Sequence, residues 1–191
     1  MPRTREQFSE MKDERRTAIL KAALPLFSLG QKVTIDMIAD KAKCSHGIVY
    51  HYYKNTDQIL QKLMASSTSV ELRQKLQSTE GSSYERIEQI ISVLLDVSKE
   101  KFENACYLNM IIRENDKSSV RFLLTKLIKD GQAANTIIGG DPNQLVDSVF
   151  LLLKGVYLTF LLEKHPDIKV PSCETLMQLL RKPTNFSRQI L

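Results

Sequence analysis

Helical periodicity runs through every long segment of this 191-residue chain and constrains its fold more than any other feature. Apolar residues recur three and four positions apart, the spacing that places them on one face of an α-helix. No segment shows a convincing run of alternating polar and apolar residues bounded by hairpin turns, as strands would. Glycine and proline residues fall between the periodic segments, where helix breakers belong. The sequence therefore predicts an all-α fold of about nine helices.

The N-terminal part of the chain predicts a group of short helices. A first helix is expected over 15–28, ending at Gly30. Thr34 is the predicted N-cap of a second helix, because its hydroxyl can accept a hydrogen bond from a free amide of the next turn. Ser45 is the predicted N-cap of a third, very short helix for the same reason. Three short helices followed by longer ones indicate a compact head joined to a larger body.

Thr56 is the predicted cap of the fourth helix, which we expect to begin at Asp57 and to continue past Met64. On this basis we divide the chain into a head, residues 1–56, and a body, residues 57–191. A continuous helix at the boundary would leave little slack between the two parts.

Two helices joined by a short turn, with an exposed polar N-terminus on the second, have the outline of a helix-turn-helix. In the third predicted helix, Ile48, Val49 and Tyr52 are apolar enough to face inward. The outward face then consists of side chains that suit DNA: Ser45, His46, Gly47, Tyr50 and His51.

A dozen spaced positions extend this outline over about residues 15–64. They are Ile19, Ala23, Phe27, Gly30, Thr34, Ile38, Ala39, Ala42, Ser45, Gly47, Tyr50 and Leu60. In this arrangement the segment resembles the head of the TetR family of transcriptional regulators. The resemblance implies a DNA-binding head that reads the major groove of a near-palindromic operator, followed by a helical ligand-binding and dimerisation domain.

The outward residues suggest individual roles at DNA. His46 can donate or accept at a base edge, and Gly47 lets the backbone approach the duplex closely. Ser45, Tyr50 and His51 carry the hydrogen-bonding groups expected at phosphates. We expect Thr34, Lys54 and Thr56 to flank them as contacts to the DNA backbone.

Two residues depart from the family pattern. Lys43 lies in the turn between the second and third helices, where the family usually has glycine, so a strained left-handed backbone is expected there. Thr56 stands where the family tends to carry a lysine that reaches a phosphate. A hydroxyl and the amides of a helix N-terminus can still bind phosphate at that position.

The segment after Asp141-Pro142, a good helix start, is apolar nearly all round up to the stop signal at His165-Pro166. One of its two stripes comprises Val149, Leu152, Val156 and Phe160, and the other comprises Val146, Phe150, Leu153, Tyr157 and Leu161. A soluble protein can bury both stripes if one meets its own core and the other meets a partner. We therefore expect a homodimer, and the resemblance implies that the last two helices form a four-helix bundle with their copies.

The middle helices, expected over 83–101, 102–114 and 118–132, are the region that encloses a small-molecule pocket in the family. Candidate pocket residues from these and neighbouring helices are Met64, Phe102, Tyr107, Met110, Phe122, Phe150 and Tyr157. Methionine and aromatic residues at helical spacing are more often core than ligand contacts. The implied function is a regulator, most commonly a repressor, released from its operator by a small and largely apolar effector, with no cofactor.

Several other classes of protein are disfavoured by composition and spacing. Cys44, Cys106 and Cys173 lie far apart, which argues for reduced thiols in a cytoplasm. The spacing of His46 and His51 turns their rings apart, so we expect no metal site. The polar N-terminus does not suit a signal peptide, and the apolar stretch 149–162 is shorter than the roughly 20 residues of a membrane-spanning helix.

Two alternatives to a ligand-responsive regulator remain. One is an enzyme, although the sequence shows no nucleotide-binding glycine loop, metal cluster or nucleophile motif in a recognisable frame. The other is a helix-turn-helix protein that binds DNA constitutively or responds to oxidation of a cysteine thiol.

Overall fold

The computed structural model describes residues 5–96, 102–114, 117, 119–163 and 170–183. These residues form ten α-helices and no strand, with one isolated antiparallel bridge between Ile137 and Arg181. The all-α prediction is confirmed. The predicted helix end at Lys101, the start at Ser118 and the stop at His165-Pro166 lie outside the described residues.

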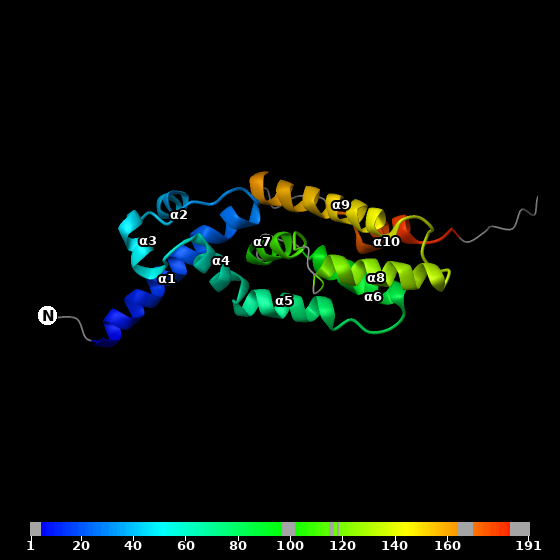
Figure 1. Ribbon diagram of the computed structural model, residues 1–191, viewed down its shortest axis with the longest axis horizontal. Helices are drawn as coiled ribbons and strands as arrows, with labels where there is room; N and C mark the ends of the chain where they lie inside the picture. Colours follow the sequence, from blue (N-terminus) through cyan, green and yellow to red (C-terminus); the bar gives the residue numbers. More distant parts are fainter. Residues whose placement is uncertain (1–4, 97–101, 115–116, 118, 164–169, 184–191) are drawn as a thin grey trace, which may run out of the picture.

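We take as the head four helices, one of which, α4, lies beyond the boundary expected at residue 56: α1 (Arg5–Ser28), α2 (Ile35–Lys41), α3 (His46–Tyr52) and α4 (Thr56–Met64). Figure 1 shows α1 to α3 at one end of an elongated molecule. Helix α1 begins well before the predicted start at residue 15. Residues 10–18 are all exposed, so no apolar pattern could mark this extension.

The core of the head is small and closed. Helices α2 and α3 pack on each other and α1 packs on α2 and α4. The side chains that fill this core are fully buried: Ile19, Ala23, Ile38, Ala39, Val49 and Ile59. The small residues of α2 allow the close helix contact that the sequence pattern predicted.

Short polar side chains cap the helices of the head. The Thr34 and Ser45 hydroxyls accept hydrogen bonds from the Met37 and Ile48 amides, at 3.2 Å and 3.3 Å, as predicted. The predicted cap at Thr56 is wrong, because Asn55 caps α4 by accepting from the Gln58 amide at 2.9 Å. Asparagine is at least as good an N-cap as threonine, and Thr56 becomes the first residue of the helix.

The predicted continuous helix past Met64 is also wrong. Helix α4 ends at Met64, and α5 (Ser67–Gln77) begins after a cap at Ser66, whose hydroxyl accepts from the Ser69 amide at 3.2 Å. A serine that bonds the backbone of the following turn competes with helix continuation. Head and body therefore meet at a joint, which raises the number of helices from about nine to ten.

The body contains α5 together with α6 (Ser83–Leu94), α7 (Phe102–Ile111), α8 (Val120–Ala133), α9 (Pro142–Glu163) and α10 (Cys173–Leu180). Helix α7 packs against α1, α5 and α9, and α8 packs against α6 and α9. In Figure 1, α9 and α5 run along opposite sides of the body with α7 and α8 between them. Helix α10 packs against α6.

Helix α9 buries one face and exposes another. Val146, Phe150, Leu153 and Tyr157 are almost completely buried, and the Tyr157 hydroxyl donates a hydrogen bond to the Leu94 carbonyl. On the other side the exposed apolar residues are Leu151, Leu152, Leu158 and Leu162. The predicted stripe of Val149, Leu152, Val156 and Phe160 does not form this exposed face, because Val149 and Phe160 are buried and only Leu152 of the four is exposed.

The length of α9 corrects the sequence analysis. Its segment Pro142–Leu162 has 21 residues and a mean hydropathy of 1.9, so it meets the length and composition of a membrane-spanning helix. The prediction that this stretch is too short is therefore wrong, because the helix begins at Pro142, before the most apolar residues. Length and composition alone are weak evidence for a membrane, since the core helix of a soluble protein passes the same test.

Lys43 has a φ of 53°, the left-handed conformation expected from its place in the α2–α3 turn. Glycine would adopt this conformation without steric cost. We expect Lys43→Gly to stabilise the protein by about 0.5–1 kcal/mol in urea unfolding. Lys43→Ala is the matched control, since it also removes the long side chain but keeps a Cβ. Equal stability of the two variants would contradict strain at this residue.

Candidate nucleic-acid interface

The two sides of α3 differ sharply in burial. Val49 is fully buried in the head core, with Ile48 and Tyr52 partly buried beside it. The Arg16 guanidinium lies over the Tyr52 ring, 5.7 Å from its centroid, and ties α3 to α1. The opposite side is entirely exposed and contains the five residues predicted for DNA: Ser45, His46, Gly47, Tyr50 and His51.

Gly47 is not required by the fold of the head. Its φ is not positive, and a Cβ at this position would meet only the Ser45 hydroxyl oxygen, at 4.0 Å. An alanine would be favoured by helix propensity at this site by about 1 kcal/mol. The absence of a side chain at Gly47 therefore suits the close approach of a binding partner to α3.

His46 is oriented by a partner that the sequence analysis missed. Its Nδ1 lies 3.2 Å from Oδ1 of Asp36, in the first turn of α2. Both side chains are more than half exposed, so the contact contributes little to stability. It does fix the imidazole of α3 relative to α2. No local sequence pattern could indicate this pair, because it depends on how the two helices pack.

The flanking candidates lie around the same surface. Thr34 is exposed at the start of α2, and its hydroxyl can still donate a hydrogen bond while it accepts from Met37. Lys54 is exposed after α3, with its backbone amide held by the Gln58 side chain at 2.7 Å. Thr56 is half-buried in the first turn of α4. The groups together offer hydrogen-bond donors, one cation and a close-approach glycine.

The candidate effector residues do not share one cavity. Phe150 and Tyr157 are buried in the core, and Phe102 is partly exposed with its ring 6.1 Å from that of Phe160. Tyr107 borders a hollow between head and body, and Phe122 lines another beside α5.

Met64 and Met110 are the two candidates that meet in one space. They line a hollow of about 260 Å³ between head and body, called here the junction hollow. Its head side is formed by Phe27, Gly30 and Leu60, and its far side by Arg113 and Glu114. It brings together flexible apolar side chains from both parts of the chain.

The end of α1 is bonded to α7 beside this hollow. The Asn109 side-chain amide, itself buried, donates to the Ser28 carbonyl at 2.9 Å. The Arg113 guanidinium donates to the carbonyls of Phe27 and Ser28, both at 3.3 Å. Ser28 is the last residue of α1, so its carbonyl has no partner within the helix, whereas the Phe27 carbonyl also accepts from the Gly30 amide at 3.0 Å. Sequence reasoning missed both residues.

Glu114 links this contact to α5. Its two carboxylate oxygens accept hydrogen bonds from both terminal nitrogens of Arg73, in a partly buried, bidentate pair. Bidentate arginine–carboxylate pairs hold a defined geometry. Arg113 and Glu114 therefore connect the end of the head to α5 through adjacent residues.

The described residues contain no group of three or more His, Cys, Asp or Glu side chains that could hold a metal ion. His46 and His51 are both exposed on α3. Their place on the outward face suits hydrogen bonding to a partner.

Comparisons with known proteins agree with this geometry. Residues 19–63 match the family model described as bacterial regulatory proteins, tetR family. The match spans the helices that form the head, from Ile19 in α1 to Leu63 in α4. The match covers the head and less than half of the chain.

Solved structures extend the likeness over the body of the chain. A tetR-family regulatory protein from Rhodococcus RHA1 is 14% identical, with a TM-score of 0.59 over 89% of this chain and 98% of the other. A ketosteroid transcriptional regulator of Mycobacterium tuberculosis is 11% identical, with a TM-score of 0.57 over 88% and 96%. At these identities the likeness shows the fold.

A third structure carries ligands. AibR, solved in complex with isovaleryl coenzyme A and operator DNA, is 16% identical, with a TM-score of 0.56 over 86% of this chain and 94% of the other. No curated protein matches the chain. The fold is that of these solved regulatory proteins, and the prediction of a helix-turn-helix head followed by a helical domain is confirmed.

The backbone conformation and close packing at Gly30, beside the junction hollow, favour glycine over any residue with a side chain. Gly30 has a φ of 75°, and a Cβ there would overlap the Arg113 guanidinium. We expect Gly30→Ala to lower the free energy of unfolding by about 1–3 kcal/mol, measured by urea denaturation. The loss should be smaller in an Arg113→Ala background, where the overlap is gone and only the backbone strain remains.

Gly139→Ala is the control for this prediction. No heavy atom lies within 4 Å of the added Cβ, and the φ of Gly139 is not positive. It should change stability by no more than about 0.5 kcal/mol. A Gly30→Ala variant as stable as Gly139→Ala would show that the junction is not strained in the way described.

Proposed function

We propose that this chain is a TetR-family protein and a homodimeric, ligand-responsive DNA-binding regulator that reads its operator with the outward face of α3. The observation that carries the proposal is the division of α3 into a buried side anchored by Val49 and an exposed side of hydrogen-bonding and small residues. A helix built in this way fits the major groove, where base edges present donors and acceptors.

The roles of the outward residues follow from their chemistry and position. His46, oriented by Asp36, reads a base edge, and Gly47 lets the helix approach the duplex. Ser45, Tyr50 and His51 bond phosphates on either side.

The flanking residues extend these contacts along the duplex. Thr34, Lys54 and Thr56 contact the DNA backbone beside α3, where Lys54 contributes the positive charge. Exposed hydroxyls and a lysine side chain are the groups that commonly bond phosphate oxygens.

A second copy of the chain covers the outward face of α9. Leu151, Leu152, Leu158 and Leu162 are exposed to between 41% and 68%, an apolar surface that a lone soluble chain would leave in water. Gly155 lies on the same face, and no heavy atom lies within 4 Å of the position of its missing Cβ. A glycine at this point allows the partner helix to approach closely.

We infer that a small-molecule effector loosens DNA binding, which makes the protein a repressor acting in the cytoplasm. Support comes from AibR, which was solved with both isovaleryl coenzyme A and operator DNA. The effector must favour the non-binding arrangement of the heads by about 1–3 kcal/mol, the usual scale of coupling between sites.

Control by thiol oxidation is less well supported by the surroundings of the cysteines. Cys106 is fully buried, and burial raises the pKa of its thiol to about 12, which removes the reactive thiolate at neutral pH. Burial also raises the pKa of Cys173, which is partly exposed. Cys44 is partly buried in the α2–α3 turn. A repressor insensitive to peroxide is therefore expected.

The DNA-binding proposal predicts two different effects of mutation at the head. His46→Ala should change the preferred operator sequence by about 1 kcal/mol or more at one base pair of each half-site. Lys54→Ala should weaken all sequences alike and lower the slope of log affinity against log salt by about 1. Fluorescence anisotropy with an operator library at several salt concentrations measures both.

Lys129→Ala, an exposed lysine of α8 in the body, is the control for charge. It should leave affinity and salt slope unchanged. Equal affinity of the wild-type protein for operator and scrambled DNA, across all candidate sites of its own genome, would count against the proposal.

The dimer proposal predicts that Leu152→Glu gives a soluble, folded monomer, because it places charge in the shared apolar face. Phe150→Glu should instead unfold the protein, since Phe150 is buried in the core. Asn143→Glu adds the same charge to an exposed position elsewhere on α9 and should remain dimeric. Sedimentation at micromolar concentration distinguishes these states, and a wild-type monomer would refute the proposal.

A further inference from the structure

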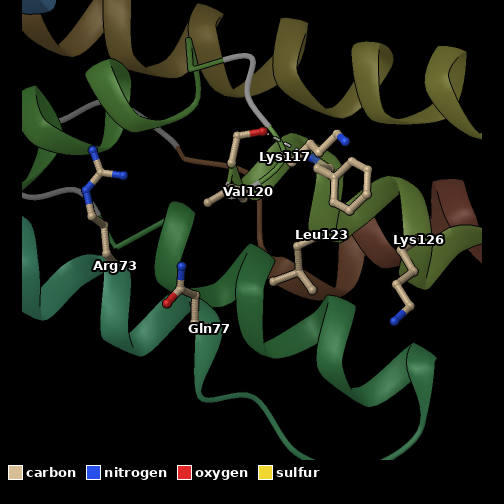
Figure 2. A pocket seen from close by; sticks show the side chains of 8 residues that line it. Arg73, Gln77, Lys117, Val120, Leu123 and Lys126 are labelled. Atoms are coloured by element: carbon tan, nitrogen blue, oxygen red, sulfur yellow. Dashed lines mark hydrogen bonds between the residues drawn. The ribbon is translucent and has the colours of Figure 1, made fainter.

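A hollow of about 300 Å³ lies between α5 and the first turns of α8. Figure 2 shows Arg73 and Gln77 extending from α5 and Val120, Leu123 and Lys126 from α8, with Arg73 and Lys126 at opposite ends of the view. We call it the α5–α8 hollow. Its volume is at the lower end of the range for small-molecule sites.

The α5–α8 hollow carries an excess of positive charge. Arg73, Lys117 and Lys126 line it, and no carboxylate among the described residues does so. Arg73 is compensated by its bidentate pair with Glu114. Lys117 and Lys126 are exposed and form no ion pair with any described residue. The lysines therefore set the sign of the potential in the hollow.

The walls between these cations are apolar. Val120 and Leu123 contribute aliphatic surface, and Phe122 leaves 53% of its side chain exposed. An organic molecule that covers this exposed aromatic side chain removes apolar surface from water, which favours binding, and its charged group can lie next to the cations. A ligand that uses both features has an anionic group and a hydrocarbon part.

Two other hollows lack this combination. The hollow lined by Arg121 and Lys154 contains its own carboxylate, Asp147, which pairs with Arg121. The junction hollow includes Glu114 beside Arg113. Each of these carries an internal counter-charge, so an external anion is favoured most in the α5–α8 hollow.

We propose that the α5–α8 hollow binds the effector and that the effector is an amphipathic organic anion, a carboxylate or phosphate ester on a short hydrocarbon. This inference rests on the proposed ligand response and replaces a largely apolar effector with a charged one.

The geometry also suggests how such an anion acts on the head. An anion at Arg73 competes with Glu114 for the guanidinium. Glu114 follows Arg113, which holds the carbonyls at the end of α1. Weakening the Arg73–Glu114 pair therefore affects the neighbouring contact between Arg113 and the end of α1, which holds the head on the body.

Isothermal titration calorimetry of the full chain with four six-carbon probes tests the ligand class. Hexanoate and hexyl phosphate should bind at least about tenfold more tightly than hexanol and hexylammonium, because each can form charge-assisted hydrogen bonds. Whichever anion binds more tightly identifies the head group. Hexanol or hexylammonium binding as tightly as both anions would overturn the proposal.

Variants place the binding in the hollow. Lys117→Gln combined with Lys126→Gln should abolish the preference for anions and leave hexanol binding unchanged, whereas Lys129→Gln, a lysine of α8 outside the hollow, should behave as wild type. Phe122→Ala should weaken all four probes alike. Glu114→Gln should tighten the anions alone, since it removes their competitor at Arg73. An anion preference that survives the double lysine variant would refute this site.

Operator binding, measured separately by anisotropy, distinguishes this inference from the proposed function. Hexanoate that binds in the hollow and releases DNA supports both. Hexanoate that binds without affecting DNA overturns the effector assignment and the link through Glu114. A chain that binds no operator at all overturns the proposed function and with it the effector role.

Discussion

The carbonyl oxygens at the end of α1 receive hydrogen bonds from Asn109 and Arg113 of α7. The last carbonyls of a helix have no partner within it, and the Ser28 carbonyl and the Asn109 amide meet in a buried environment. Leaving either group without a partner there would cost about 1–3 kcal/mol. The position of the head on the body depends on this contact, and Gly30 supplies the turn that permits it.

At three surfaces of the molecule, the residues present make the isolated chain less stable than other residues would. Gly47 weakens α3 where alanine would fit, leucines of α9 face water, and lysines line the α5–α8 hollow with no carboxylate among the described residues that line it. Such local violations of folding rules concentrate at functional sites, where a partner compensates them. In our proposal, DNA, a second copy of the chain and an anionic effector each compensate one of the three.

The head could be predicted in some detail because its signals are local. Burial of Val49, exposure of the opposite side of α3 and the caps at Thr34 and Ser45 follow from residues close in sequence, whereas the left-handed Lys43 followed from the resemblance to the family. The fourth helix was misjudged because apolar spacing continues across the break at Ser66. Only the serine hydroxyl, which also fits a helix interior, marked the change.

The body could be predicted as a fold but not as a site. Met and aromatic residues at helical spacing look the same whether they fill a core, as Phe150 and Tyr157 do, or border a hollow, as Met110 does. The pair Arg73–Glu114 joins residues 41 positions apart, and Asn109–Ser28 joins residues 81 apart. No local pattern carries such contacts, because they depend on how the helices pack.

Dimethyl sulfate protection of the operator is the most direct test of the claim that α3 enters the major groove. The reagent methylates guanine N7 in the major groove and adenine N3 in the minor groove. The account predicts that the protein protects guanines in two patches on one face of the duplex, separated by about one helical turn, about 34 Å, or somewhat more. Protection confined to adenine N3, or an unchanged guanine pattern in a saturated complex, would contradict it.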